Sequence, residues 1–301
     1  MFYLLLICTA IYIYFILFII SGLFKHNVLP VSHSKNLPFV SVVIAARNEE
    51  NNLPELLDDL INQEYPLNKF EIIIVNDRSS DSTPEILKNA SDNYAFIKTI
   101  NINKKSEIMT PKKNAVNEGI KSSKGEIILA TDADCRMGAL WIASMAYSLM
   151  NKNGIIIGYS EISDIKKSYF EKYQKLDFLA ILIANAGASG WNQYWSGTGQ
   201  NLAYYKKDYF EIGGFDPVKN KISGDDMYLV QSISNIKRGY THIDPNSFVK
   251  TKAMSTIKDF INQRIRWSSN SKSNFKNEPL FFTFLLTSFL ENFLILLSIL
   301  F

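Results

Sequence analysis

Two long apolar runs lie near the ends of the chain. Residues 2–24 contain no charged side chain, and residues 280–301 are interrupted only by Glu291 and Asn292. At about 1.5 Å of rise per residue, a helix of this length covers a hydrocarbon core of roughly 30 Å. We therefore expect a transmembrane anchor at residues 1–24 and a second transmembrane segment at 280–301. A charged Glu291 is unfavourable against lipid, so it should face another helix, the interface or a polar path.

Each run has an alternative interpretation. A cleaved signal peptide at the first run is disfavoured because no basic segment precedes it, the apolar stretch is too long, and no small-residue cleavage site follows. Near Glu291, a hairpin or an interfacial bend is the alternative. Basic residues flank both runs on the side of the intervening segment: Lys25, Lys35, Arg264, Arg266, Lys272 and Lys276. The positive-inside rule therefore predicts a two-span protein of the cell (inner or plasma) membrane with this segment in the cytoplasm, where nucleotide-activated substrates are available.

Between the apolar runs, short β-rich stretches alternate with helical patterns, as in βα units that cover a mostly parallel sheet. Buried strands are expected at residues 39–45, 70–75, 96–102, 126–131 and 155–159. Helices are expected after the first strand, from a capping box at Ser82 and Glu85, and at residues 112–123. The predicted fold class is α/β, with helices on both faces of the sheet and transmembrane helices flanking it.

The second half of this segment is less regular. We expect an amphipathic helix at residues 169–184 and a Gly-rich loop at 187–199. Residues 25–38 are interpreted as a connector from the anchor, and residues 39–272 as one soluble domain. Ligands of open α/β sheets bind beyond the carboxyl ends of the strands. Asn48, Asp77 and Asp132 are expected there.

Composition narrows the possible functions. The chain has 32 basic and 29 acidic residues without a long block of one sign, so no nucleic-acid partner is expected. Its two cysteines, Cys8 and Cys135, lie far apart, which excludes a disulfide framework and a thiolate zinc site and fits a reducing compartment. The histidines, His26, His33 and His242, show no metal-ligand spacing, so solvated or structural roles are expected for them.

Acidic residues follow two of the predicted strands. Asp132 and Asp134 can point at one cation from a turn, and magnesium or manganese needs oxygen ligands with positions left open for phosphates. The alternative is an acidic turn that caps a helix beginning near Gly138. Asp77 can accept a hydrogen bond from a base N–H, or simply close the turn between its strand and the next helix.

Two further clusters lie in the second half. Asp225 and Asp226 begin a predicted helix, where the helix dipole stabilises carboxylates for structural reasons alone; a catalytic base needs the same placement and a cleft. Near the second apolar run, Arg266 can neutralise a pyrophosphate, and Trp267 can stack on a sugar or an acceptor. The alternative there is an interfacial helix with snorkelling arginines and an anchoring tryptophan.

Together these motifs resemble the membrane-bound family 2 glycosyltransferases, which include hyaluronan, chitin and cellulose synthases and lipid-directed sugar transferases. The resemblance spans about residues 39–267. It rests on the order of seven short segments, at residues 41–50, 75–81, 112–116, 131–134, 199–204, 224–226 and 263–267. It implies a GT-A fold for a catalytic domain at 39–272, a nucleotide-diphosphate sugar donor with UDP as the expected nucleotide, and a Mg or Mn divalent cation.

The resemblance also implies a role for each matching position. The donor-binding residues would be Ala45, Glu49, Asp77, Lys112, Asp132, Gln263, Arg266 and Trp267, with Asp77 reading the uracil. The metal residues would be Asp134 and Asp132, and the acceptor side would comprise Gly199, Gln200 and Asn201. Asp226 matches the general base, with Asp225 in place of a frequent glutamate, as in hyaluronan synthases. Pro111 replaces the usual glycine before Lys112, which weakens the case for that lysine.

The implied function is an inverting transfer of a sugar to a lipid or saccharide acceptor at the cytoplasmic membrane face. A processive polysaccharide synthase is one alternative, although a secretion channel needs several membrane helices and this chain offers about two. A non-catalytic membrane scaffold that kept the fold is another. An NAD-dependent enzyme is disfavoured because residues 46–50, after the first strand, lack the G-x-G-x-x-G fingerprint.

Overall fold

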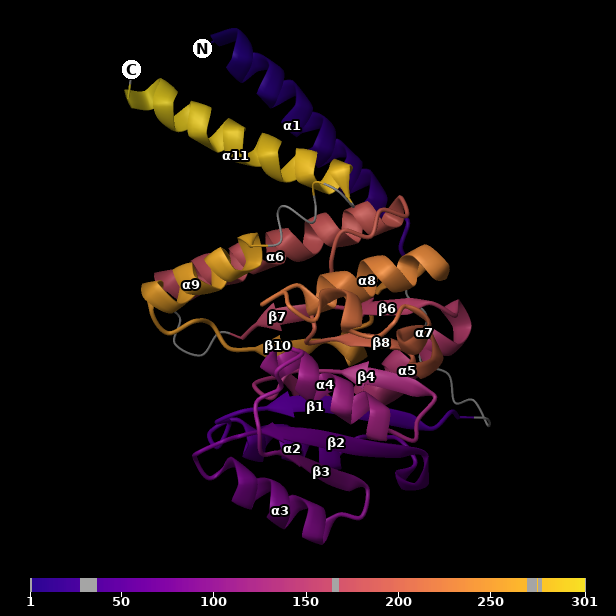
Figure 1. Ribbon diagram of the computed structural model, residues 1–301. Coiled ribbons are helices and arrows are strands. Elements are labelled where there is room, and N and C mark those ends of the chain that lie inside the picture. The colour runs from indigo at the N-terminus through magenta and orange to yellow at the C-terminus, as the bar shows by residue number, and fades with distance from the viewer. Residues whose placement is uncertain (1, 28–36, 164–167, 270–274, 276–277, 301) are drawn as a thin grey trace.

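The computed structural model describes residues 2–27, 37–163, 168–269, 275 and 278–300. Most of the predicted connector, together with His33, Lys35, Lys272 and Lys276, lies outside the described residues. Figure 1 shows an α/β body with two long helices, from the two ends of the chain, projecting from it on one side.

A seven-stranded sheet forms the centre of the body, in the order β3-β2-β1-β4-β8-β6-β9. Its strands are β1 (Val40–Ala46), β2 (Phe70–Asp77), β3 (Ile97–Ile102), β4 (Ile127–Ala130), β6 (Ile155–Gly158), β8 (Leu202–Tyr205) and β9 (Gly239–His242). Strand β8 is antiparallel to both of its neighbours, and the other pairs are parallel. The mostly parallel sheet is confirmed, and the five expected strands agree with it to within two residues.

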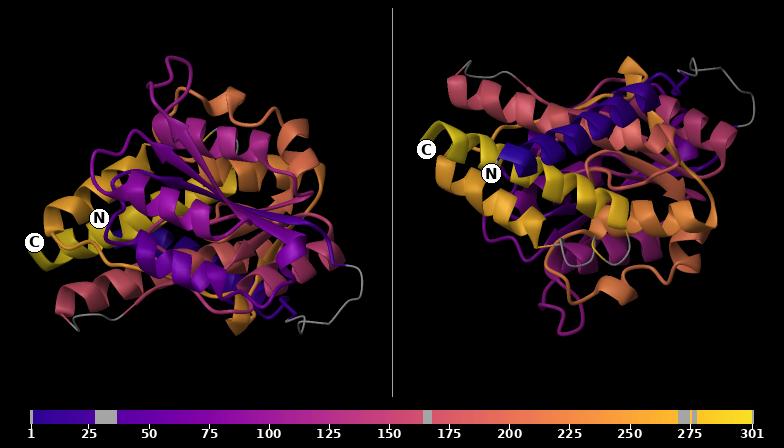
Figure 2. Two further views of the ribbon diagram at one scale, coloured as in Figure 1. Left: turned by 90° about the horizontal axis from the view of Figure 1, so that it is seen from below. Right: turned by 90° about the horizontal axis from the view of Figure 1, so that it is seen from above.

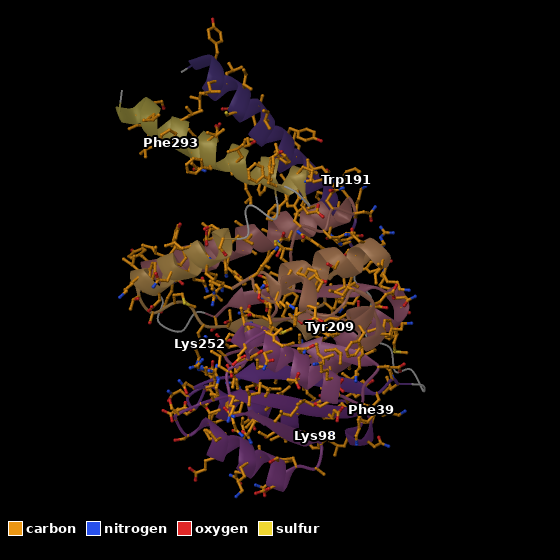
Figure 3. All side chains as sticks on the ribbon, viewed as in Figure 1. Phe39, Lys98, Trp191, Tyr209, Lys252 and Phe293 are labelled. Atoms are coloured by element: carbon orange, nitrogen blue, oxygen red, sulfur yellow. The ribbon has the colours of Figure 1, made fainter. Side chains whose placement is uncertain are left out.

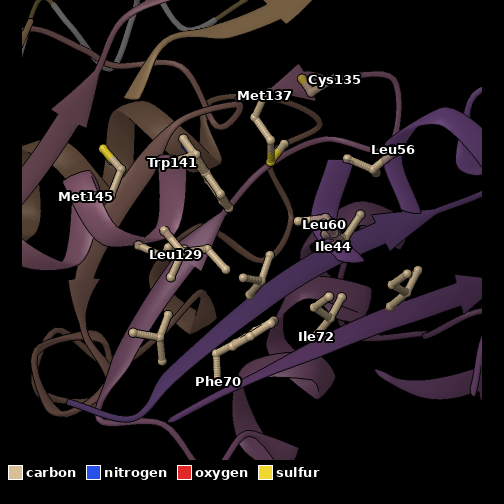
Figure 4. Packing of buried hydrophobic residues seen from close by; sticks show 14 of the residues in the cluster. Ile44, Leu56, Leu60, Phe70, Ile72, Leu129, Cys135, Met137, Trp141 and Met145 are labelled. Atoms are coloured by element: carbon tan, nitrogen blue, oxygen red, sulfur yellow. The ribbon is translucent and has the colours of Figure 1, made fainter. Parts of the chain in front are cut away.

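Helices cover both faces of this sheet, as predicted. One face packs against α2 (Leu53–Ile61), α3 (Thr83–Asn93) and α5 (Trp141–Lys152), and the other against α4 (Pro111–Ser122) and α8 (Asp225–Ile236). Along β1, Ile44 joins the first cluster, shown in Figure 4, while Val43 joins the second. Burying one such aliphatic side chain stabilises the fold by about 1.5–3 kcal/mol. Burial on both faces explains why these strands are continuous apolar runs in the sequence.

A second, three-stranded sheet was not predicted. It has the order β5-β10-β7, with β5 (Arg136–Met137), β7 (Ser160–Ile162) and β10 (Val249–Thr251). Strands of two or three residues are too short for an alternating pattern to be recognised. The remaining short elements are α7 (Lys206–Glu211) and 3₁₀ turns at Leu67–Lys69, Asp216–Val218 and Pro245–Ser247.

Helix α6 (Tyr169–Gly190) begins where predicted but extends past residue 184, so the beginning of the expected Gly-rich loop is helical. The reason is packing against α1 (Phe2–Leu23). A Cβ added to Gly187 would lie 2.4 Å from the carbonyl oxygen of Ile19, and one added to Gly190 would lie 2.1 Å from that of Gly22. The glycines therefore mark a place where two helix backbones touch.

The capping box predicted at Ser82 is wrong. The Ser82 side chain makes no capping hydrogen bond. Instead, the amides of Ser82 and Thr83 donate to the carboxylates of Glu50 and Asp81, at 2.9 and 3.1 Å. The start of α3 is therefore held by acidic side chains.

The terminal helices α1 and α11 (Pro279–Leu300) lie on the same side of the body in all views (Figures 1 and 2). Their segments Tyr3–Leu23 and Pro279–Ile299 are long and apolar enough to cross a membrane. Glu291 faces the partner helix, as expected, where its carboxylate accepts a hydrogen bond from the Thr9 hydroxyl at 2.8 Å. Before α11, helix α9 (Ile257–Ser268) packs along α6 through Phe260, which contacts the rings of Phe170 and Tyr173.

Candidate active site

The candidate site lies where β1, β2 and β4 end. Asp77 is the last residue of β2, and Asp132 and Asp134 lie in the turn after β4. Lys112 is in the first turn of α4, and Asp226 is in the first turn of α8. The fold therefore brings segments that are distant in the sequence to one edge of the sheet, as expected for ligand sites in α/β proteins.

Asp77 is buried at the end of β2 and paired with a neighbouring arginine. The Arg78 guanidinium donates to both of its carboxylate oxygens, at 2.8 and 3.0 Å, and Arg47 lies at 4.0 Å. A carboxylate has about four lone-pair positions, so two remain for another donor such as a base N–H. Ala45, which precedes the end of β1, pairs with Val75 in the adjacent strand.

The loops after β1 and β2 are tied together by hydrogen bonds. The Asn48 amide donates to the Ser79 hydroxyl at 3.0 Å, and the Ser80 amide donates to the Asn48 side-chain oxygen at 2.9 Å. Asn48 and Arg78 both adopt a φ of 56°. This left-handed conformation is uncommon outside glycine, and Asn tolerates it better than most residues. The two loops therefore form one rigid rim beside Asp77.

Glu49 belongs to an acidic cluster. Its carboxylate accepts a hydrogen bond from the Asn52 amide at 2.7 Å. Burial raises the pKa of Glu49, and the carboxylates of Asp134 and Asp132 raise it further. Glu49, Asp132 and Asp134 therefore gather negative charge in one place, which a bound cation would relieve.

The two aspartates after β4 have different partners. Lys112 donates to Asp132 at 2.7 Å. Desolvation lowers the pKa of Lys112, but the carboxylates of Asp132, Asp225 and Asp226 outweigh it, so the net shift is upward and the ammonium stays charged. Among the described residues, the Asp134 side chain has two long contacts with other side chains, from the Thr251 hydroxyl at 3.5 Å and the Cys135 thiol at 3.7 Å.

This donor set suits a hard divalent cation. Burial raises the pKa of Asp134, and so does the charge of Asp132, as expected for a carboxylate without a strong partner. In the described part of the chain, no group of three His, Cys, Asp or Glu side chains is arranged to hold a metal ion. A cation bound through Asp134 would therefore keep most of its positions for water and phosphate oxygens, as magnesium does.

Asp226 is fixed by two backbone amides. The Gly199 amide donates to one carboxylate oxygen at 3.2 Å, and its own neighbour Met227 donates to the other at 2.8 Å. Burial and the charge of Asp225 raise the pKa of Asp226 to about 6. The chain enters α8 through Gly224, whose φ of 84° favours glycine. A carboxylate with this pKa is mostly ionised at neutral pH and is a better base than an ordinary aspartate.

Beneath Asp225 lies a buried lysine. Lys113 donates to the Lys221 carbonyl oxygen at 2.6 Å and lies 3.9 Å from Asp225. Desolvation lowers the pKa of Lys113 despite the nearby aspartates. Lys113 therefore holds the segment before α8 in place, a role that the sequence did not suggest.

The segment before β8 approaches Asp226 through its backbone. A Cβ added to Gly199 would lie 3.7 Å from Asp226 Cβ and 3.9 Å from Lys112 Nζ, so Gly199 sits between these residues. Asn201, in contrast, is fully buried: it accepts from the Trp141 indole at 3.0 Å and donates to the Tyr159 and Ser247 carbonyl oxygens at 2.8 and 2.7 Å. Because its side-chain amide makes these three hydrogen bonds, Asn201 holds the segment before β8 in position from the buried side.

Gln200, the residue before Asn201, has a buried side-chain oxygen with no hydrogen-bond partner among the described residues.

The sequence analysis missed the contribution of β10 and the residue after it. Lys252 donates to the Asn52 side chain at 2.5 Å, and Thr251 is the residue that contacts Asp134. Because β10 has only three residues, no sequence pattern indicated that it reaches the acidic cluster.

The predicted residues on α9 have partners of their own. Gln263 accepts a hydrogen bond from Arg264 at 3.1 Å, and Arg264 forms an ion pair with Asp177 of α6. Arg266 is exposed and forms no ion pair within the described residues, while Trp267 packs against Phe178 of α6. The structure thus brings Asp77, Asp132, Asp134, Lys112 and Asp226 to one edge and holds α9 against α6.

Comparison with known proteins identifies the family of this arrangement. The model of Glycosyl transferase family 2 matches residues 41–224. The probable glycosyltransferase YdaM of Bacillus subtilis is 30% identical over 268 residues, which are 85% of this chain and 62% of YdaM. The beta-monoglucosyldiacylglycerol synthase of Trichormus variabilis is 31% identical over 140 residues, which are 46% of this chain and 30% of that protein. The chain thus spans less than two thirds of the length of these relatives.

Solved structures agree on the fold. Mannosyltransferase PcManGT from Pyrobaculum calidifontis, in complex with GDP-Man and Mn²⁺, has a TM-score of 0.70 at 19% identity, covering 94% of this chain and 79% of its own. Residues 1–349 of S. aureus TarS, in complex with UDP-GlcNAc, have a TM-score of 0.52 at 15% identity, covering 72% and 59%. The expected GT-A fold is confirmed. Because the family model matches more than half of its residues, the chain belongs to glycosyl transferase family 2.

Proposed function

We propose that this protein is a metal-dependent, inverting glycosyltransferase that uses a nucleotide-diphosphate sugar at the cytoplasmic face of a membrane. One observation carries the proposal. Asp226 lies close to the acidic turn after β4, since Gly199 sits between Asp226 and Lys112, and Lys112 donates to Asp132 at 2.7 Å. A general base thus lies beside a site for a cation and a diphosphate.

The donor would lie along the rim formed by the loops after β1 and β2. Asp77 has free lone pairs for the base N–H, with Ala45 and Glu49 nearby on β1 and its loop, and UDP is the expected nucleotide. Asp134 would hold magnesium or manganese, with Asp132 beside it. PcManGT was solved with GDP-Man and Mn²⁺, and TarS with UDP-GlcNAc, which supports a nucleotide-sugar donor and a divalent cation for this chain too.

Proton transfer to Asp226 would start the reaction. Asp226 removes the proton of the acceptor hydroxyl, whose oxygen attacks the anomeric carbon while the nucleoside diphosphate leaves from the opposite face, so the anomeric centre is inverted once. The amides of Gly199 and Met227 hold the carboxylate in a fixed direction. Lys112 adds positive charge on the donor side, and the divalent cation, when bound, neutralises charge on the leaving diphosphate. Once a donor is bound, we expect Arg266 to contact its diphosphate, and Gln263 and Trp267 to contact the donor as well.

The acceptor side would open toward the membrane, with Gly199 and Gln200 at its wall. Helices α1 and α11 would span the bilayer, with residues 39–272 as the catalytic domain. On α9, Ile257, Ile261 and Ile265 are exposed at a spacing of four residues, which forms an apolar stripe suited to a membrane surface. The beta-monoglucosyldiacylglycerol synthase relative supports a lipid acceptor. A saccharide acceptor is the alternative.

Within the family, the motifs favour the membrane-bound group that includes hyaluronan, chitin and cellulose synthases. A processive polysaccharide synthase remains the alternative to a transferase that adds one sugar. Product length by mass spectrometry separates the two.

Donor binding tests the proposal directly. We would screen UDP- and GDP-sugars by calorimetry on the full chain in detergent, with Mn²⁺ or Mg²⁺ and then with EDTA. We expect at least one donor to bind only with the metal, and Asp134→Asn to weaken that binding at least tenfold. Asp92→Asn, an exposed change on α3, is the matched control and should bind as the wild type does. A non-catalytic scaffold would bind no nucleotide sugar in a metal-dependent way, and that result would end the proposal.

A further inference from the structure

A cavity lies away from the candidate active site. Its volume is about 410 Å³, within the range of roughly 300–1,000 Å³ that is usual for ligand pockets. It is lined by the residues that follow α1, the carboxyl ends of α5 and α6, and strand β9. Strands β8 and β6 separate β9 from β4, so this cavity belongs to a different part of the sheet from the acidic turn. No step of the proposed reaction uses it.

The cavity is cationic. It is lined by Lys25 after α1, Lys152 at the end of α5 and Arg238 just before β9, and no carboxylate is among its lining residues. None of these three side chains forms an ion pair within the described ranges. Three uncompensated positive charges around one polar cavity favour an anion.

Aromatic rings hold these cations without neutralising them. Lys25 Nζ lies 3.0 Å from the centre of the Trp191 ring. Lys152 Nζ and the Arg238 guanidinium lie 5.3 and 5.4 Å from the centre of the Tyr240 ring. Such contacts orient a cation and leave its charge available for a ligand. The nearby Asp244 is engaged elsewhere, since it accepts from the Ser144 hydroxyl at 2.6 Å.

The cavity lies where α1 leaves the membrane-spanning region. Helix α1 ends at Leu23, two residues before Lys25, and its end is locked against α6 by the Gly22 and Gly190 contact. Figure 3 shows Trp191 beside this end of α1, well separated from Lys252, which lies near the acidic cluster. With α1 in the bilayer, Lys25 and its neighbours would stand at the level of lipid headgroups.

We propose that this cavity binds the phosphate of an anionic phospholipid headgroup. Lysine and arginine are the residues that recognise phosphate, and basic pockets on the cytoplasmic side of membrane helices bind anionic headgroups. The proposal rests on the membrane placement of α1 proposed above and not on the chemistry at Asp226. Binding would have a structural consequence. One headgroup would contact the end of α1, α5 and β9 together and so hold the catalytic domain against the membrane.

Lipid binding to the full chain in neutral detergent tests this. Phosphatidylglycerol should raise the melting temperature and bind more tightly than phosphatidylcholine. The double variant Lys152→Gln/Arg238→Gln should bind phosphatidylglycerol roughly thirtyfold more weakly, since each basic residue contributes a factor of about five. Lys88→Gln/Lys124→Gln, two exposed lysines elsewhere, makes the same charge change and should leave binding unchanged. Arg238→Lys, which keeps the charge, should retain most of the binding even if the double variant folds poorly.

Three results would overturn the proposal. One is equal binding of phosphatidylglycerol and phosphatidylcholine, and another is equal loss of binding in the double variant and its control. The third is inorganic phosphate that raises the melting temperature as much as the lipid at equal concentration, because the ligand would then be a free anion. The measurement is binding rather than turnover, so its failure leaves the proposed reaction untouched.

Discussion

At the scale of single residues, the surroundings of Asp226 determine its pKa and its orientation. Burial removes water from the carboxylate, and Asp225 adds a second negative charge beside it, so the pKa of Asp226 rises to about 6. The amides of Gly199 and Met227 counter this shift and fix the carboxylate in one direction. A base needs both properties: enough proton affinity to accept, and a fixed direction from which to do so.

This pKa predicts a pH profile for turnover. With donor and metal saturating, kcat should rise about tenfold per pH unit below pH 6 and level off above it, because only ionised Asp226 accepts a proton. A stopped assay from pH 4.5 to pH 8 measures this. A flat profile across pH 6 would contradict the role of Asp226.

The protonation of Asp226 does not itself promote unfolding at low pH. The pKa of Asp226 is raised in the folded state, so its contribution to stability is present at low pH and is lost as the pH rises through about 6. Protonation of Asp226 below pH 6 therefore does not destabilise the fold. Circular dichroism over the same pH range serves as the control.

The sequence predicted the acidic residues of the site better than their partners. Asp77, Asp132 and Asp134 follow strands, and the ends of parallel strands meet at one edge, so their proximity followed from the pattern. Asn201 lies in a segment that resembles a family motif. Its side-chain amide is hydrogen-bonded to the Trp141 indole and to two carbonyl oxygens, and these contacts follow only from the packing. The direction of Arg266 also depends on how α9 rests on α6, which no local pattern specifies.

At the scale of elements, the crossing of α1 and α6 joins the terminal helix to the α/β body. The two backbones approach so closely that a Cβ at Gly22 would lie 1.9 Å from the Gly187 carbonyl oxygen. Backbone atoms cannot move aside as a flexible side chain can. Small residues at such a crossing are typical of close helix contacts.

Gly187→Val should therefore destabilise the protein. Overpacking of this kind costs about 1–3 kcal/mol, although valine is a better helix former than glycine. The melting temperature in detergent should fall. Ala180→Val, on an exposed turn of the same helix, is the matched control and should change it little. An unchanged melting temperature for Gly187→Val would show that the helices do not cross there.

Long elements were predictable from the sequence, and short ones were not. The buried strands β1 and β2, of seven and eight residues, are continuous apolar runs bounded by polar turns, so their positions followed directly. Strands β5, β7 and β10 have two or three residues each, and their pairing is decided by the chain around them. The end of α6 was missed because Gly187 and Gly190 usually indicate a loop, and their role in packing depends on α1.

At the scale of the whole molecule, the sheet separates two charged regions. The acidic turn follows β4, and the cationic cavity lies against β9 at the end of the strand order. The first would hold a cation and a donor, and the second a lipid headgroup beside α1. This separation is consistent with the proposed catalytic domain, which would contact the membrane through the cationic cavity and bind its donor at the acidic turn.

The membrane orientation can be measured by cysteine labelling. Cys8 and Cys135 are both buried, so a cysteine introduced at the exposed Ser268 position should dominate the reaction with an impermeant maleimide. We expect Ser268→Cys to react only after the membrane of the expressing cells is opened, because the proposed orientation places the domain in the cytoplasm. Labelling in intact cells would contradict that orientation.

Asp226→Asn tests the central claim most directly, with turnover and donor binding measured on the same preparation. Turnover should fall by about 10² to 10⁴, the usual contribution of a general base, while metal-dependent donor binding should stay within about threefold of the wild type. Asp92→Asn should leave both unchanged. A variant that keeps wild-type turnover would contradict the account, since Asp226 would then not remove the proton of the acceptor hydroxyl.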